Sequence, residues 1–424
     1  MVGVTVRRRV SPRTWTGLQS LRVKVRQAQA KVAMPRYPGM PLLSIIVAAY
    51  DTEDYVVAAL ASLRNQQWPK IEVIVVDDGS SDDTAARVAE FAAHDKRFRL
   101  VRQANAGPGA ARNRGAALAR GKYIAFFDSD DLADPFFYRQ AVIGLELSGS
   151  DFAIGAYDIL IGDRRLLPPR YIRELHQRSR RHLTLASLPA VMTNALICTR
   201  VFRREFYVRA VAPQPEGVFY EDQILAMRAF VRARGFDLLH QSALQWRRRE
   251  IRKSTTQRSA EVDNLRQRTQ AYRQVADFLA EAGLEAVRRQ RLAQILATNQ
   301  LTLNQLAVAT QEYCDVARDF LEYAIAEVGE DTYERTVDLQ DRVLQTLVRR
   351  GDLAAAQSFL LADGRSLDQW VFHDDPELGP LGWLPNWPLD QQVDLPPSVR
   401  RPSERQRTSN QPKPMVTSQF HDEV

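Results

Sequence analysis

A cluster of carboxylates follows an apolar run in a pattern that suits metal-dependent chemistry. The run Lys122–Phe127 is apolar after its lysine, and Asp128-Ser129-Asp130-Asp131 comes directly after it. Such a run is typical of a buried parallel strand, and alternate residues of a strand point the same way, so Asp128 and Asp130 can converge. Two convergent carboxylates bind Mg²⁺ or Mn²⁺ while phosphate oxygens of a substrate complete the coordination shell. The alternative is an acidic turn in solvent.

The segments around this cluster alternate between strand and helix patterns. Strand patterns lie at Leu43–Ala49, Ile71–Val76, Phe98–Arg102 and Asp151–Tyr157, and helix patterns follow the first three. This alternation predicts an α/β domain with a doubly wound, mostly parallel sheet of the Rossmann type. Ligands of such sheets bind outside the carboxyl ends of the strands.

Polar residues and glycines follow these strand ends and are candidates to bind a ligand. They are Tyr50, Asp51, Asp78, Gly107 and Arg112. Asp78 can accept hydrogen bonds from the N–H groups of a base, and a loop with Gly107 and Gly109 lets the backbone approach a ligand closely. Each acid alone could equally cap the following helix. Capping does not explain polar residues at every successive strand end.

Two runs of the sequence resemble the glycosyltransferases of family two, which have the A-type nucleotide-sugar fold. The similarity covers about residues 42–134 and is carried by SIIVAAYDTEDYVVAALASLRNQQWPKIEVIVVDDGSSDDT and NAGPGAARNRGAALARGKYIAFFDSDD. The resemblance implies a nucleoside-diphosphate-sugar donor and makes Asp128 and Asp130 the ligands of Mn²⁺ or Mg²⁺. The donor-binding residues that it implies are Ala49, Tyr50, Asp51, Asp78, Gly107, Arg112, Asp128 and Ser129.

A second carboxylate pair, Glu221-Asp222, follows Phe219 and Tyr220. The resemblance implies that the pair opens a helix and that Asp222 is the general base of an inverting transferase. A carboxylate within hydrogen-bond reach of an acceptor hydroxyl can take its proton as the hydroxyl attacks the anomeric carbon. Without the resemblance, the pair would be helix N-terminal acids that the helix dipole favours.

The basic run from Trp246 to Thr256 is a third candidate, because cations and hydroxyls stabilise a departing diphosphate. It resembles the loop that closes over the donor in members of the family. We expect Arg249 or Lys253, together with Ser254, to contact the diphosphate. The alternative is a solvated basic loop.

Composition limits the partners and the compartment. The chain has 424 residues and a net charge of +7, which favours anionic partners such as nucleotides, phosphorylated polymers or anionic membranes; we expect no nucleic-acid partner. Its two cysteines, Cys198 and Cys314, are far apart, which excludes a CxxC metal site and suits a reducing compartment. Because no signal peptide or membrane-spanning apolar run is apparent, we expect a cytoplasmic protein that either stays in solution or contacts the inner face of the cell membrane.

Five segments of the chain differ in character. We expect a basic amphipathic arm at residues 1–40, a catalytic domain at 41–257, a helical region at 258–365, an irregular Trp- and Pro-rich strap at 366–397 and a disordered tail at 398–424. Trp15, Leu18 and Leu21 share one stripe of the arm, which predicts a helix that binds an anionic membrane or packs on the protein. The helical region has apolar stripes without an acid or histidine cluster, which favours core packing or a homo-oligomer; acceptor docking is the alternative.

Together these patterns predict a metal-dependent inverting hexosyl- or N-acetylhexosaminyltransferase that uses a UDP-sugar. By analogy with the family, the acceptor is a hydroxyl of a cell-surface polymer such as a teichoic-acid-type chain. One alternative is transfer to a lipid-linked or capsular oligosaccharide precursor, and another is a nucleotide-sugar-binding protein without catalysis. A nucleotidyltransferase is disfavoured because Ala48–Thr52 lacks a glycine-rich phosphate loop.

Overall fold

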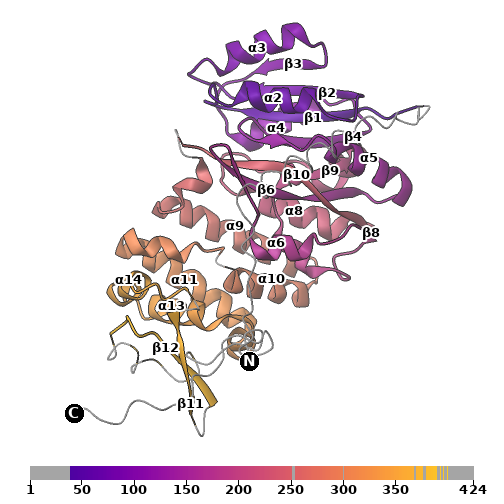
Figure 1. Cartoon of the computed structure of the whole chain (residues 1–424). Coiled ribbons are helices and arrows are strands. Elements are labelled where there is room, and N and C mark those ends of the chain that lie inside the picture. The colour runs from indigo at the N-terminus through magenta and orange to yellow at the C-terminus, as the bar shows by residue number, and fades with distance from the viewer. Residues whose placement is uncertain are drawn as a thin grey trace, which may run out of the picture.

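The computed structural model describes residues 39–250, 254–298, 300–366, 369–375 and 379–388, together with residues 392, 395 and 399. These residues form a sheet domain and a helical region that lie next to each other (Figure 1). The predicted N-terminal arm, apart from residues 39 and 40, lies outside the described residues, as do Lys253 and the predicted tail apart from residue 399.

A ten-stranded sheet is the centre of the first part. Its order is β3 (Phe98–Arg102), β2 (Ile71–Asp77), β1 (Leu43–Ala49), β4 (Tyr123–Asp128), β9 (Arg200–Arg203), β6 (Phe152–Ile161), β10 (Phe236–Arg248) and β5 (Leu132–Ala133), with β7 (Arg164–Leu166) on β6 and β8 (Arg180–Leu183) on β10. β1 pairs in parallel with β2 and β4, and β2 pairs in parallel with β3. The predicted α/β fold with a doubly wound, mostly parallel sheet is confirmed.

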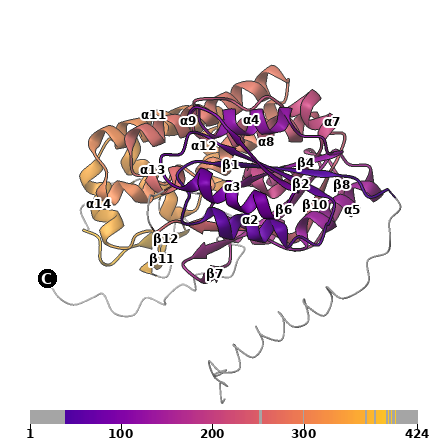
Figure 2. The ribbon, with the colours of Figure 1, turned by 90° about the horizontal axis from the view of Figure 1, so that it is seen from above.

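Helices cover both faces of this sheet, which is why its central strands are mostly apolar. The exceptions before the strand ends are Ser44 of β1 and Glu72 of β2, and Ser44 Oγ donates to Glu72 Oε1 at 2.6 Å. The helices are α2 (Val56–Arg64), α3 (Thr84–His94), α4 (Pro108–Ala117), α5 (Phe137–Ser148), α6 (Arg170–Leu175), α7 (Arg204–Phe206) and α8 (Glu221–Arg232). The chain runs outward from β1 through α2 and α3 to β3, then returns through α4 to β4, so right-handed crossovers put α4 on the face opposite α2 and α3 (Figure 2). The strand order therefore reverses between β1 and β4, which is where such sheets bind ligands.

Two features of the sheet depart from the simple alternating pattern. β9 is inserted antiparallel between β4 and β6. β10 continues to Arg248 because Trp246–Arg248 pair with Ile159–Ile161 of β6. The prediction of a loop that starts at Trp246 is therefore wrong for these first residues, and the loop can begin only after β10.

The helical region follows the sheet domain, as predicted. It consists of α9 (Val262–Glu281), α10 (Glu285–Ala297), α11 (Gln311–Val328), α12 (Glu330–Thr336), α13 (Leu339–Arg349) and α14 (Leu353–Leu361). Val275 and Leu279 of α9 pack in the sheet core, whereas Leu265 and Tyr272 of the same helix pack in the helical core. α9 thus joins the two cores. In the part of the chain that the structure describes, no helix combines the length and apolarity needed to cross a membrane.

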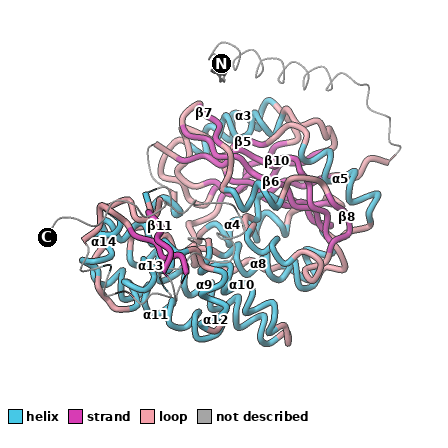
Figure 3. Tube along the Cα trace, turned by 60° about the horizontal axis from the view of Figure 1, so that its bottom comes forward, coloured by secondary structure: helices cyan, strands magenta, loops and turns pink. Residues whose placement is uncertain are grey.

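The Trp- and Pro-rich segment is not wholly irregular, contrary to the prediction. β11 (Val371–Asp375) and β12 (Gly379–Trp383) form an antiparallel hairpin beside the helices (Figure 3). Trp370 and Trp387 are buried against Phe359 of α14, with ring centroids 6.1 and 5.1 Å from the phenyl ring. The hairpin forms by pairing between two short strands. Because prolines are rare within strands, this proline-rich sequence does not suggest them.

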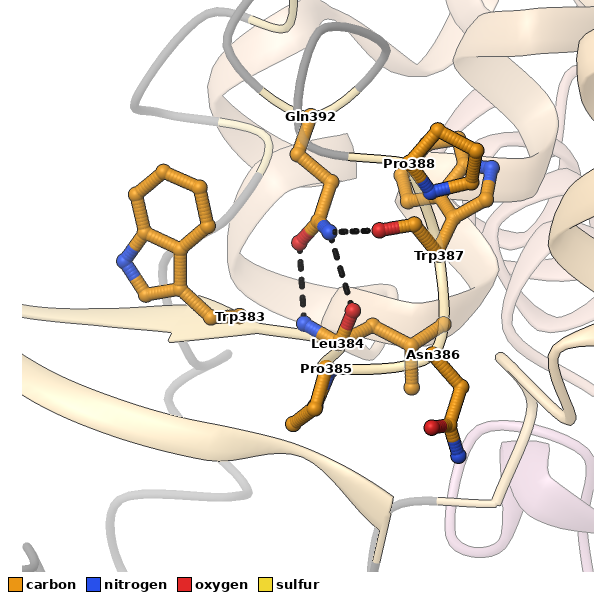
Figure 4. A pocket seen from close by; sticks show the side chains of 7 residues that line it. All are labelled: Trp383, Leu384, Pro385, Asn386, Trp387, Pro388 and Gln392. Atoms are coloured by element: carbon orange, nitrogen blue, oxygen red, sulfur yellow. Dashed lines mark hydrogen bonds between the residues drawn. The ribbon is translucent and has the colours of Figure 1, made fainter.

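A hollow of about 500 Å³ opens on the same segment, lined by residues 383–388 and Gln392 (Figure 4). Gln392 holds its wall, since its Nε2 donates to the carbonyl oxygens of Leu384 at 2.9 Å and Trp387 at 2.6 Å. A second hollow of about 440 Å³ lies between Phe136 and Gln241. Neither hollow contains a predicted site residue.

Candidate active site

The carboxyl ends of β1, β2 and β4 lie side by side at one edge of the sheet. In the parallel register Ala49 pairs with Asp77, and Ala48 pairs with Asp128. The backbone N–H of Asp78 donates to the carbonyl oxygen of Ala49 at 2.8 Å. The structure therefore brings together three of the predicted candidates, Ala49, Asp78 and Asp128.

The loop after β1 is held against the loops after β2 and β4. Asp51 has a positive φ of 47°, and its Oδ1 accepts a hydrogen bond from the backbone N–H of Ser81 at 2.8 Å. Thr52 Oγ1 and Ser129 Oγ are 2.9 Å apart. Tyr50 lies in the same loop with 46% of its surface exposed, so its ring is accessible to a ligand.

Asp78 is buried and organises the loop after β3. Its Oδ1 accepts hydrogen bonds from Gln103 Nε2 at 2.7 Å and from the backbone N–H of Ala106 at 3.0 Å. Its Oδ2 accepts one from the backbone N–H of Gly107 at 2.8 Å, and Gly107 precedes α4 with a φ of 88°, which favours glycine. A carboxylate can accept about four hydrogen bonds, so a bond from a base would add to three that Asp78 makes within the protein.

Gly109 does not provide the close approach to a ligand that the sequence suggests. A Cβ at this position would lie 1.9 Å from the carbonyl oxygen of Pro215, so the group that approaches is the protein's own backbone. Asn113, one turn further along α4, donates through Nδ2 to the carbonyl oxygen of Gln214 at 2.9 Å. α4 is thereby held on the segment that leads to α8.

Gly109→Ala is expected to lower the free energy of unfolding by about 1–3 kcal/mol, because the added methyl group must displace backbone. Urea or thermal unfolding measures the loss. Gly149→Ala is the control for a loss without a steric clash: a Cβ there meets no atom within 4 Å and only the φ of 72° is strained, so we expect a loss of about 1–2 kcal/mol from the left-handed backbone alone. Wild-type stability of Gly109→Ala would contradict the close packing on Pro215.

A buried arginine links the acidic motif after β4 to the second acidic pair. Arg112 of α4 is 6% exposed; its Nη2 donates to Asp128 Oδ1 at 2.7 Å, and its Nη1 donates to Glu221 Oε1. Burial acts to lower the pKa of this guanidinium, but the charges of Asp128 and Glu221 outweigh burial and raise the pKa above its ordinary value. Arg112 therefore stays charged and joins α4, β4 and α8 at one place.

Asp130 and Asp131 lie beside the end of β10. Arg249 Nε donates to Asp130 Oδ2 at 2.6 Å, and the backbone N–H of Arg247 donates to Asp131 Oδ1 at 2.8 Å. Burial raises the pKa of both carboxyls; Arg249 opposes the rise at Asp130, whereas the charges of Asp130 and Asp128 add to the rise at Asp131. The structure thus brings Arg249 to the acidic motif as an ion-pair partner of Asp130.

The acidic motif fits a divalent cation. Asp128 and Asp130 each use one carboxylate oxygen in an ion pair with an arginine, and each carboxylate has two. Asp130 and Asp131 are buried and Asp128 is partly exposed. Three carboxylates within four residues repel one another, and a cation would relieve that repulsion. Two carboxylates with phosphate oxygens of a substrate are a usual magnesium site. Among the described residues, no group of three or more His, Cys, Asp or Glu side chains is arranged to hold a metal ion.

Asp222 is the second residue of α8 and is half-buried. Burial, and then the charge of Glu221, raises the pKa of Asp222 to about 7, against the opposing charges of Arg112 and Arg200. Arg200 is fully buried, and burial lowers its pKa to about 9 although Asp222 acts to raise it. A carboxyl with a pKa near neutrality can both take and release a proton under ordinary conditions.

The structure describes only part of the basic run that was predicted to contact a diphosphate. Ser254 precedes the short helical turn Thr255–Arg258, and its Oγ donates to Gln257 Oε1 at 3.1 Å. Gln257 Nε2 in turn donates to the carbonyl oxygen of Arg249 at 2.8 Å. Ser254 is thus connected to Arg249, and contact of either residue with a diphosphate stays a prediction.

Some features of this site could not be predicted from the sequence. The ion pair between Arg112 and Glu221 joins residues 109 positions apart, and no local pattern indicates it. Arg200 also has no recognisable motif around it, since it is simply the first residue of the short strand β9. Asp131, by contrast, is recognisable in the sequence, because it belongs to the acidic run after β4.

Residues 44–209 match the family model described as glycosyl transferase family 2. The chain is 37% identical over 193 residues to the succinoglycan biosynthesis protein ExoO of Rhizobium meliloti, which is 45% of this chain and 52% of that protein. It is 29% identical over 211 residues to the uncharacterized glycosyltransferase EpsJ of Bacillus subtilis, 49% of this chain and 61% of that protein. The chain thus spans between about half and three fifths of the length of these two relatives.

The fold is also similar to that of a solved structure. Residues 1–349 of S. aureus TarS, crystallised in complex with UDP-GlcNAc, align with a TM-score of 0.60 at 21% identity, over 81% of this chain and 96% of that chain. The structural likeness is therefore longer than the family match and concerns the fold. The family match and the two relatives agree that residues 44–209 are similar to the domain of family-2 glycosyltransferases.

Proposed function

We propose that this protein is a metal-dependent, inverting glycosyltransferase that moves a hexosyl or N-acetylhexosaminyl group from a UDP-sugar to a hydroxyl of a cell-surface polymer. The observation that carries the proposal is that Arg112 pairs with both Asp128 and Glu221, which brings the Glu221-Asp222 pair to the carboxyl ends of the strands. Burial also raises the pKa of Asp222 to about 7, as suits a general base. ExoO, which is named for succinoglycan biosynthesis, supports a polysaccharide acceptor.

The fold and the loops at the sheet edge support a UDP-sugar donor. TarS was crystallised with UDP-GlcNAc and with UDP. In our proposal the exposed ring of Tyr50 and the carboxylate of Asp78 face the base. The other donor contacts that we propose are Ala49, Asp51, Gly107, Arg112, Asp128 and Ser129.

In the proposed reaction Asp222 takes the proton of the acceptor hydroxyl while the hydroxyl oxygen attacks the anomeric carbon. The new C–O bond forms on the face opposite the diphosphate, whose bond to the anomeric carbon breaks and which leaves with the electron pair, so the configuration inverts. Arg249 or Lys253, together with Ser254, stabilises the negative charge that grows on the diphosphate. Mn²⁺ or Mg²⁺ held by Asp128 and Asp130 would supply positive charge at the same place.

Hydrolysis of nucleotide sugars tests this function without knowledge of the acceptor. The protein is incubated with Mn²⁺ and each of UDP-GlcNAc, UDP-GalNAc, UDP-glucose and UDP-galactose, and released UDP is measured. We expect slow release of UDP from one donor, and less release from it by Asp222→Asn. Tight binding of a UDP-sugar without release, even when polysaccharide acceptors are added, would favour the non-catalytic alternative.

The rate of sugar transfer at saturating donor is expected to rise with pH, by about tenfold per unit below pH 7, and to level off above it. The sign follows from the pKa of Asp222, which is raised to about 7: below that pH the carboxyl is protonated and cannot accept the acceptor's proton. Initial rates at constant metal concentration measure this profile. In Asp222→Asn the rate should no longer rise with pH in this range. A wild-type rate that levels off near pH 4 instead of pH 7 would contradict the raised pKa.

The acceptor and the place of reaction are proposed from charge. A net charge of +7 suits an anionic polymer, such as a teichoic-acid-type chain, or an anionic membrane. A lipid-linked or capsular precursor at the inner face of the cell membrane is the alternative acceptor.

A further inference from the structure

The turn that carries the proposed base is held by residues of the helical region. This turn, Phe219–Gln223, contains Glu221 and Asp222 and begins α8. The backbone N–H of Phe219 donates to Gln267 Oε1 of α9 at 2.8 Å. At the other end of the turn, Gln223 Oε1 accepts a hydrogen bond from Arg291 Nη2 of α10 at 3.0 Å. The two ends are therefore bonded to two helices outside the sheet domain.

Tyr220, the residue directly before the acidic pair, is held most closely. Its φ of 63° and ψ of 27° lie in the left-handed region, which a tyrosine adopts only when its surroundings impose it. Arg268 Nη2 donates to the hydroxyl of Tyr220 at 2.6 Å, and that hydroxyl donates to Asn264 Oδ1 at 2.6 Å. The guanidinium of Arg268 also lies 4.9 Å from the centre of the tyrosine ring. Two side chains of α9 thus hold both the hydroxyl and the ring.

The arginines that make these contacts are themselves buried. Arg268 and Arg291 each expose 2% of their surface. Arg268 Nη2 also donates to Asn264 Oδ1 at 3.0 Å, and Arg291 Nη2 also donates to Gln300 Oε1 at 2.9 Å. Arg268 also donates through Nη1 to Thr302 Oγ1, so several hydrogen bonds fix it, whereas the hydrogen bonds of Arg291 within the described part of the chain come from Nη2 alone. A buried guanidinium that is fixed by hydrogen bonds has little freedom to move. Each arginine can therefore transmit the position of its helix to the turn.

α9 is anchored in both parts of the protein, because its apolar residues pack in both hydrophobic cores. Its C-terminal half packs in the sheet core through Val275 and Leu279, and Leu265 packs in the helical core. Residues 264, 267 and 268, which contact the turn, lie in the N-terminal half of the same helix. Figure 1 shows α9 between the sheet domain and α11. The helix thus links the position of the turn to the packing of the helical region.

We propose that the helical region completes the catalytic unit, with Gln267, Arg268 and Arg291 as positioning residues that hold the Phe219–Gln223 turn. This inference rests on the proposed function, because it takes Asp222 as the general base. A base displaced by about 1 Å loses on the order of 10²-fold in rate, so contacts that fix the turn would affect transfer without touching donor or acceptor. The helical region then has a role beyond core packing or oligomerisation.

Tyr220→Phe and Arg268→Lys test this role, with Arg273→Lys as the control. Phenylalanine keeps the ring and removes only the hydroxyl, and lysine keeps the charge. Arg273 also belongs to α9, but it pairs with Asp319 of α11 at 2.8 Å. We expect the first two variants to release UDP from the hydrolysed donor roughly 10- to 100-fold more slowly, with the Kd for UDP and Mn²⁺ unchanged. The double variant should lose little more turnover than either single variant, because both substitutions disrupt the same contact between Arg268 and the hydroxyl of Tyr220.

Hydrogen exchange of the backbone amides of residues 220–224 is the second measurement and does not depend on turnover. Exchange should become faster in Tyr220→Phe and Arg268→Lys and stay at the wild-type rate in Arg273→Lys. If both variants match Arg273→Lys in rate and in exchange, the positioning role is overturned. It is also overturned if the Kd for UDP weakens in proportion to the rate. If Asp222→Asn keeps wild-type activity, the proposed base fails, and exchange still decides whether the helical region holds the turn.

Discussion

Asp222→Asn is expected to bind UDP and the UDP-sugar as the wild type does and to transfer sugar on the order of 10²–10⁴-fold more slowly. Asparagine keeps the shape of the side chain, but its amide cannot take the proton of the acceptor hydroxyl. Burial already raises the pKa of Asp222 to about 7, so a neutral side chain is tolerated there and the fold should be retained. Calorimetry with UDP measures binding, and sugar transfer or donor hydrolysis measures turnover.

The chain offers a close control for this substitution. α12 also begins with a Glu-Asp pair, Glu330-Asp331, in which Asp331 is exposed. Asp331→Asn makes the same chemical change at the same position of a helix, so it reports any effect of losing a first-turn charge. We expect Asp331→Asn to keep wild-type turnover. Near wild-type transfer by Asp222→Asn would remove Asp222 as the base, and Glu221 would be tested next.

Asp130→Ala is expected to abolish the part of UDP affinity that depends on Mn²⁺ or Mg²⁺. The affinity for UDP in the presence of metal should fall by more than about 10-fold. Mutation of residues that only orient metal ligands already lowers metal affinity by about 10- to 100-fold. Asp128→Asn should lower both donor binding and transfer, because one cation would serve the bound donor and the departing diphosphate. Calorimetric titration of UDP, with Mn²⁺ and with a chelator, measures the dependence on metal.

Two further variants separate loss of a ligand from other effects. Asp130→Ala also deprives Arg249 of its ion-pair partner, whereas Asp130→Asn keeps a hydrogen-bond acceptor for Arg249 and loses only the charge. Both should lose metal dependence. Asp163→Ala, in an exposed turn between β6 and β7, should bind UDP and metal as the wild type does. Unchanged metal dependence of UDP binding in both Asp130 variants would remove Asp130 from the site.

The edge of the sheet that carries the acids could be predicted from sequence. β1, β2 and β4 are buried on both faces, so each is a mostly apolar run that is recognisable by itself, although Ser44 interrupts β1 and Glu72 interrupts β2. Parallel strands put their carboxyl ends at one edge, and a polar residue directly after a strand must lie there. Asp78 and Asp128 were therefore predicted together, and the register of β1 with β2 and β4 brings them together.

Features that depend on pairing with a distant segment were predicted wrongly or missed. Trp246–Arg248 look like loop residues until the pairing with β6 is known. Gly109 looks like a ligand-binding glycine, but its neighbour is Pro215, more than one hundred positions away. In both cases the local residues are compatible with two structures, and a long-range backbone contact selects one of them.

The sequence by itself therefore determined the family that residues 44–209 resemble, the order of the first strands along the chain and the residues at their ends. Only the tertiary structure decided how those residues are charged and held. The ion pairs of Arg112 with Glu221 and of Arg249 with Asp130 join residues 109 and 119 positions apart, and the pKa of Asp222 depends on what buries it. The contacts of α9 and α10 with the turn before α8 likewise come from packing between two cores. Periodicity reports which face of an element is apolar, whereas burial and ion pairing depend on which elements meet, and that is settled only when the whole chain has folded.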